Sequence, residues 1–114
     1  MGALLVFLGG GTGALLRYAA GKLLPEGLST FTVNVLGCLL MGALAGWLMG
    51  REQGESWRLL LGVGVLGGFT TFSAFALDFA SLWRDQPGMA LSYAAMSVLA
   101  SLAAVFAGLW LTRP

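Results

Sequence analysis

The side chains best able to do chemistry in this sequence are amides, hydroxyls and aromatic rings set inside apolar segments. They are densest over residues 67–75, which read Gly-Gly-Phe-Thr-Thr-Phe-Ser-Ala-Phe. Because four glycines between 62 and 68 and the following Thr70-Thr71 together weaken a helix, we expect a break here. Inside a membrane, such a break survives only where it is buried in protein or lines a cavity. Its freed carbonyls can bind a cation, and its freed amides can face an anion.

Two aromatic rings follow the expected break. Phe72 and Phe75 stand at positions i and i+3, so they share one helix face beside it. Ordinary apolar packing is the alternative interpretation, because that is the usual role of a phenylalanine in a membrane.

A second polar series lies in the last apolar segment, where Tyr93, Ser97 and Ser101 are spaced i, i+4 and i+8. This spacing stacks three hydroxyls on one helix face about 6 Å apart, near the distance at which an ion can pass between donors. We interpret the series as a polar track. The alternative is that the serines pack between helices and donate to the carbonyl four residues back.

Three further polar residues each have two interpretations. Arg17 comes late in the first apolar segment, where it could collect anions or extend its guanidinium to the membrane interface. Asn34 lies about one turn into the second segment and either lines a wet path or makes an interhelical hydrogen bond. Asp78 is the only acid well inside an apolar segment, so it is either functional or paired with a basic residue near a helix end.

The composition places the chain in a lipid bilayer. Its 114 residues are 58% hydrophobic and 10% charged, whereas soluble domains carry about 25% charged residues. We expect one all-α transmembrane domain, residues 1–114, with no nucleic-acid partner. The sequence has no His, the commonest metal ligand and proton shuttle, and Cys38 has no partner for an intramolecular disulfide. Both features favour a protein that is not an enzyme.

Apolar segments of about 20 residues or more predict transmembrane helices. We expect four, at about 2–24, 29–49, 57–83 and 89–112. The turns between them are short and polar, and tryptophans lie near their ends, as amphipathic rings do at membrane interfaces. Ser29 or Thr30 is expected to cap the second helix.

Two glycine patterns are interpreted as sites of close helix packing. Residues 62–67 fit the nucleotide-binding pattern G-x-G-x-x-G, but that pattern has its meaning only between a strand and a helix of a soluble unit. Gly42, Gly46 and Gly50 repeat every four residues, which lets two membrane helices approach closely. Both patterns therefore predict packing and not chemistry.

The basic residues of the turns almost cancel between the two sides of the membrane. One side would hold Arg51, Arg58 and Arg113, and the other Lys22 and Arg84, with Arg17 close to the latter. The positive-inside rule then gives a bias of one charge or none. Either the chain inserts one way by a weak signal, or it inserts both ways and has dual topology.

Three segments together resemble the signature of the Fluc (CrcB) family of bacterial fluoride channels. They are residues 9–18, Gly-Gly-Gly-Thr-Gly-Ala-Leu-Leu-Arg-Tyr, residues 32–37, Thr-Val-Asn-Val-Leu-Gly, and residues 67–75. The match spans the chain, and three motifs in order are more specific than any one of them. The departure is Ala74, where many relatives carry a hydroxyl residue.

The resemblance implies an antiparallel, dual-topology homodimer in the bacterial cytoplasmic (inner) membrane. Cytoplasmic fluoride would leave passively through two pores per dimer, and no residue would react. A structural sodium ion would sit at the dimer centre on the carbonyls of Gly67 and Thr70. Carried over residue by residue, the vestibule and the fluoride path would be formed by Arg17, Asn34, Thr71, Phe72, Ser73, Phe75, Tyr93, Ser97 and Ser101.

Two other functions fit a chain of this size. A proton-coupled drug exporter of the small multidrug-resistance type also has four spans, but it needs a carboxylate embedded in its substrate site, and Asp78 is the only candidate. A noncatalytic assembly subunit of a larger membrane complex would carry no ions by itself.

Overall fold

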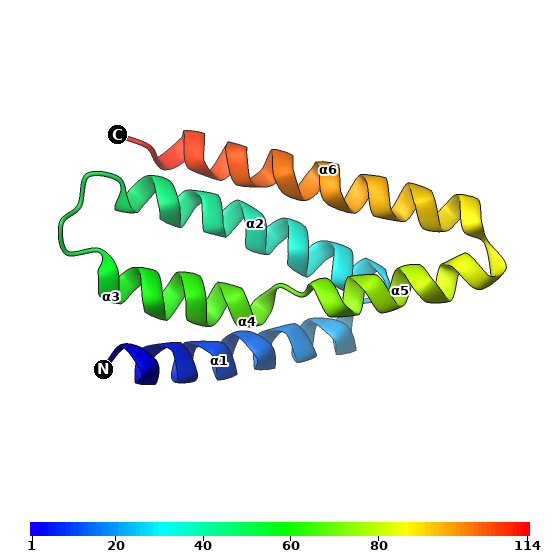
Figure 1. Ribbon diagram of the computed structural model, residues 1–114, viewed down its shortest axis with the longest axis horizontal. Coiled ribbons are helices and arrows are strands. Elements are labelled where there is room, and N and C mark those ends of the chain that lie inside the picture. Colours follow the sequence, from blue (N-terminus) through cyan, green and yellow to red (C-terminus); the bar gives the residue numbers. More distant parts are fainter.

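The computed structural model describes all 114 residues, and it is built of helices joined by short turns (Figure 1). Four helical stretches are long and apolar enough to cross a membrane, which confirms the all-α fold and the four spans. The chain is a multi-pass membrane protein. The helices are α1 (Gly2–Leu23), α2 (Leu28–Leu48), α3 (Glu55–Trp57), η1 (Arg58–Leu66), α4 (Gly67–Phe69), α5 (Phe72–Asp85) and α6 (Pro87–Thr112).

The third span is composite. It runs from Glu55 to Asp85, and the segment η1 near its start is a π-helix. The backbone leaves the helical conformation at Thr70 (φ −82°, ψ 157°) and Thr71 (φ −152°, ψ 125°), between α4 and α5 (Figure 1). The glycines of this span lie in η1 and α4, so the helix continues through them and is interrupted at the threonines.

The start of α2, after the turn that follows α1, differs from the prediction. Gly27 adopts φ 84°, a left-handed conformation that glycine accepts without strain, and α2 begins directly after it at Leu28. The prediction that Ser29 or Thr30 caps this helix was therefore wrong. Both residues lie inside its first turn, because the glycine turns the chain earlier than a side-chain cap would.

Glycines bring the helices together in two pairs. The most extensive contact is between α2 and α6, and the next is between α1 and η1. A side chain at Gly42 would meet the backbone of Val105 on α6, and the Cα of Gly64 lies 2.9 Å from where a side chain at Gly9 would begin. Gly50, the last member of the expected stripe, does not pack, because α2 ends at Leu48 and Gly50 forms the turn with φ 76°.

Replacing Gly42 by alanine is expected to destabilise the protein by about 1–3 kcal/mol, because the new Cβ meets the Val105 carbonyl. The matched control is Gly10→Ala, where a Cβ has no atom within 4 Å. That change removes a flexible glycine from a helix and should stabilise the fold by about 0.5–1 kcal/mol. Thermal unfolding in detergent measures both variants, and equal midpoints would contradict the packing role of Gly42.

A single copy of the chain has very little core. Only 14 of 114 residues are buried, and large apolar side chains such as Phe7, Leu15, Leu77 and Phe106 are more than half exposed. A soluble monomer does not expose apolar surface on this scale. Lipid or further protein must cover these faces.

Candidate functional site

The interruption between α4 and α5 is held by one side chain of α2. The Asn34 amide donates from Nδ2 to the Thr71 carbonyl (2.8 Å) and accepts at Oδ1 from the Thr71 N–H (2.7 Å). It thus pairs with extended backbone as a neighbouring strand would. The amide group carries two N–H donors, so one remains for another acceptor.

The interruption also redirects the backbone groups around it. The Thr71 N–H and the Ala74 N–H would serve the carbonyls of Gly67 and Thr70 in a continuous helix, but they donate to Asn34 Oδ1 and to Thr71 Oγ1 (3.1 Å) instead. The carbonyls of Gly67 and Thr70 therefore lose their helical partners. The Gly68 carbonyl, in contrast, accepts from Arg17 Nε (3.1 Å).

A groove of about 310 Å³ lies beside the interruption, between α2, α5 and α6. No acidic or basic side chain lines it. Its polar groups are amide, hydroxyl and thiol, and its aromatic rings are those of Phe72 and Phe75, with centroids 5.5 Å apart and planes inclined at 56°. The lining residues are Asn34, Cys38, Thr70, Thr71, Phe72, Phe75, Ser97, Val98, Ser101 and Leu102.

Two members of the expected polar track, Ser97 and Ser101, line this groove. Ser97 is 95% buried, and its Oγ has no hydrogen-bond partner. Tyr93 lies outside the groove lining, but its ring is 5.4 Å from that of Phe75. Its hydroxyl donates to Asp78 Oδ2 (3.2 Å), so Asp78 is paired with a tyrosine and not with a basic residue.

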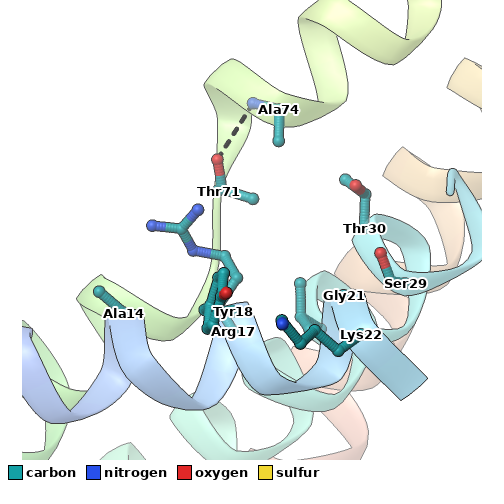
Figure 2. Close-up of a pocket in the computed structure, with 10 residues that line it drawn as sticks. Ala14, Arg17, Tyr18, Gly21, Lys22, Ser29, Thr30, Thr71 and Ala74 are labelled. Carbon is teal, nitrogen blue, oxygen red and sulfur yellow. Dashed lines mark hydrogen bonds between the residues drawn. The ribbon is translucent and has the colours of Figure 1, made fainter. Parts of the chain in front are cut away.

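A second, basic cavity of about 400 Å³ lies between α1, α2 and the start of α5 and borders the interruption at Thr71 (Figure 2). Arg17, Lys22, Ser29 and Thr30 line it, and the Arg17 guanidinium lies beside Thr71, turned away from Ser29 and Thr30. Thr71 lines this cavity and the groove as well, so it is the residue where the two meet. The remaining lining residues are Ala14, Tyr18, Gly21, Val33 and Ala74.

The structure therefore distributes the expected site residues over two cavities that share Thr71 as a lining residue. The residues that line the groove are Asn34, Thr71, Phe72, Phe75, Ser97 and Ser101. Arg17 and Thr71 line the basic cavity. The ring of Tyr93 contacts that of Phe75 and so lies next to the groove. Ser73 lines neither cavity, and its Oγ lies 3.2 Å from Thr71 Oγ1.

Several lining residues were not predicted as site residues from the sequence, among them Lys22, Ser29, Thr30 and Cys38. Thr30 and Cys38 stand four residues before and after Asn34, which places all three on one face of α2. The spacing was therefore a usable signal. Both residues were passed over because a threonine near a helix start and a lone cysteine in an apolar run have common structural explanations.

Fold and site together define a multi-pass helical membrane protein with an uncharged polar and aromatic groove. The chain belongs to the CrcB-like family, whose model "CrcB-like protein, Camphor Resistance (CrcB)" matches residues 4–109. The chain is 53% identical to the fluoride-specific ion channel FluC of Novosphingobium aromaticivorans, over 95% of this chain and 93% of the relative. It is 49% identical to the FluC channel of Caulobacter vibrioides, over 96% and 94%, and 50% identical to that of Phenylobacterium zucineum, over the same shares. These relatives are ion channels and not enzymes.

Proposed function

We propose that this chain is a subunit of a fluoride-specific ion channel that lets cytoplasmic fluoride leave the cell passively. The observation that carries the proposal is the groove, which combines hydrogen-bond donors and aromatic rings but holds no ionised side chain. The relatives named as fluoride-specific channels support it at about 50% identity. The proposed location is the bacterial cytoplasmic (inner) membrane, and the bacterial origin of these relatives supports it.

The chemistry of fluoride fits such a groove. Fluoride is small and strongly hydrated, so a pore must replace its water with strong donors. Asn34, Ser97 and Ser101 supply N–H and O–H groups, and the edges of the Phe72 and Phe75 rings carry partial positive charge. A fixed cation in the groove would bind the ion too tightly for release, so its absence there suits conduction.

The two cavities suggest a route. The guanidinium of Arg17 and the ammonium of Lys22 would raise the local fluoride concentration in the basic cavity. Thr71, which lines both cavities, and the neighbouring Ser73 hydroxyl would pass the ion into the groove. Phe72, Phe75 and the serines would then carry it onward, with Tyr93 positioning the Phe75 ring.

The test is fluoride efflux from liposomes that contain only the purified protein, followed with a fluoride electrode. We expect rapid fluoride efflux and no measurable chloride efflux from matched vesicles. Absence of fluoride efflux would refute the proposal and favour an assembly subunit. Proton-coupled drug transport that is lost in Asp78→Asn would instead favour the exporter, although Asp78 lies outside the groove and is paired with Tyr93.

We propose further that the functional unit is an antiparallel homodimer with two pores, in which the interruption at Thr70 and Thr71 lies at mid-membrane. The exposed apolar surface of one copy supports a partner, and the near balance of basic residues supports insertion in both orientations. Irregular backbone at that depth must be covered by protein or line a cavity, and the groove and Asn34 meet this condition.

Dual insertion makes a clear prediction. Reporters fused to the carboxyl terminus should signal from both sides of the membrane. Adding two lysines to the turn between Arg51 and Arg58 should fix one orientation and abolish efflux, because only one half of the dimer is then made. A one-sided reporter signal from the unmodified chain would contradict dual topology.

The carbonyls of Gly67 and Thr70 are among those that have lost their helical partners, and such oxygens fit a hard cation such as sodium. We propose that they bind a structural sodium ion at the dimer centre, where a second copy would complete the oxygen shell. When bound, the ion would offset the partial negative charge of these carbonyl oxygens.

Removal of this sodium should weaken the dimer. Prolonged dialysis against sodium-free buffer, checked by elemental analysis, is expected to reduce both the dimer fraction and efflux by about tenfold, because a ligand bound only to the assembled state stabilises it by mass action. Sodium added back should restore both. Unchanged dimerisation and efflux in verified sodium-free protein would remove this site.

A further inference from the structure

A separate apolar cavity lies where α2 and α6 end, away from the proposed ion path. It has a volume of about 450 Å³, and we call it the end groove. Two of its rings, those of Phe106 and Trp110, are more than half exposed, so the end groove is open along its side. Its lining residues are Met49, Phe106, Ala107, Leu109, Trp110 and Arg113.

Contacts between α2 and α6 fix the walls of the end groove. The Thr112 hydroxyl donates to the Ala43 carbonyl (2.7 Å), and a Cβ at Gly46 would lie 3.0 Å from the backbone nitrogen of Arg113. The end of α6 therefore packs closely against α2 (Figure 1). A cavity with walls held in this way is already formed before a ligand binds, as most ligand sites are.

The end groove runs from the membrane interface into the hydrocarbon region. Trp47, Trp57 and Trp110 all lie at this end of the helices, and indole rings favour the interface. The Arg113 guanidinium carbon is 5.7 Å from the centroid of the Trp110 ring, so it lies at the same level. Phe106 comes seven residues before Arg113, which is about 10 Å deeper by helical rise.

Charge distinguishes the end groove from the other large apolar cavity. That cavity, of about 710 Å³ between α2 and η1, includes Arg58, but the Arg58 guanidinium is already paired with the Glu55 carboxylate in the only ion pair of the chain. No acidic side chain lines the end groove, and Arg113 has no carboxylate partner. The end groove thus combines an unpaired cation at the interface with apolar walls below it.

We propose that the end groove binds one anionic phospholipid, with its phosphate on the Arg113 guanidinium and an acyl chain along Phe106 and Leu109. A guanidinium matches phosphate oxygens with two parallel N–H donors. The ammonium of a zwitterionic headgroup would find no acid in the lining, and the Trp110 face that could hold it already carries Arg113. Both features favour a lipid with net negative charge.

The experiment is native mass spectrometry of the purified protein titrated with dioleoylphosphatidylglycerol, dioleoylphosphatidylcholine or inorganic phosphate. We expect one phosphatidylglycerol per chain, phosphatidylcholine binding at least about fivefold weaker, and no displacement of the lipid by inorganic phosphate. Arg113→Gln should weaken phosphatidylglycerol binding about fivefold, the effect of one basic residue on an anionic lipid. Because fluoride takes no part in this measurement, its result is independent of the proposed channel activity.

Two variants separate the site from general surface charge. Arg58→Gln removes the same charge at the same end, but from a paired arginine, and should bind phosphatidylglycerol like the parent. Ala107→Phe keeps all charges and fills the end groove from an exposed position, so it should lose the lipid while its elution profile and thermal midpoint stay those of the parent.

Four results would overturn the proposal. Equal binding of the two lipids by the parent would show that the headgroup charge is not read. Parental affinity in Arg113→Gln, or an equal loss in Arg58→Gln, would mean that no specific phosphate contact is made. Displacement of the lipid by inorganic phosphate would show that the apolar walls contribute nothing. Loss of the dimer in Ala107→Phe, with the lipid retained, would assign the end groove to a second copy of the chain.

Discussion

Replacing Phe75 by isoleucine should reduce fluoride efflux by at least about tenfold while the proposed dimer stays intact, because the proposed pore loses an aromatic edge that would help replace the water around fluoride. The exchange keeps most of the apolar volume, and swaps of this kind usually cost less than about 1.5 kcal/mol. Phe75 stands between two other rings, at 5.5 Å from Phe72 and 5.4 Å from Tyr93. Phe72→Ile should act in the same direction, because Phe72 lines the same groove and its side chain is 77% exposed, so little packing depends on it.

Phe79 supplies the matched control for this prediction. It lies one turn further along α5, stacks on Trp83 with ring centroids 5.9 Å apart, and is absent from the groove lining. Phe79→Ile should therefore conduct at close to the parental rate. Efflux and the elution profile of the dimer are measured for all three variants. If the losses of efflux only follow the amount of folded dimer, neither ring belongs to the pore. The same conclusion holds if Phe72→Ile and Phe75→Ile conduct at the parental rate.

Exchange of Asn34 for aspartate should reduce efflux by about a hundredfold or more. Two unit charges 4 Å apart repel by about 4 kcal/mol at an effective dielectric constant of 20, and a carboxylate at this position would oppose fluoride in the groove. The aspartate still accepts from the Thr71 N–H, so the interruption keeps one of its two bonds to α2. The donor that faces the Thr71 carbonyl is lost.

The variant Asn34→Leu distinguishes the effect of an added charge from the effect of lost hydrogen bonds. Leucine has a similar volume but leaves both polar groups of Thr71 without their partner, which costs at most about 1–3 kcal/mol for each group, because Thr71 is only partly buried. This variant should therefore lose thermal stability more than the aspartate variant, whereas the aspartate variant should lose more efflux per folded dimer. Equal losses of efflux per dimer would mean that the charge is irrelevant and that Asn34 acts only as a structural tie.

Hydropathy was sufficient to predict the four spans, because a bilayer requires about 20 apolar residues in each helix and tolerates few charges within them. The polar residues worth testing could also be identified from sequence, since amides, hydroxyls and acids inside a membrane are costly and so conspicuous. Order and spacing of three motifs were enough to predict the family, which the comparisons confirm.

Contacts between distant residues decided the rest. Low helix propensity alone predicted a break in a stretch that begins at Gly62. The backbone in fact leaves the helix at Thr70 and Thr71. Asn34, which is 37 residues away from Thr71 in the sequence, makes hydrogen bonds there that replace the lost helical ones. Likewise, the pairing of Asp78 with Tyr93 depends on how α5 packs against α6. Cys38 became part of the site only because α2, α5 and α6 meet around one groove. Such pairings depend on the relative positions of whole helices, which local propensity and hydropathy do not encode.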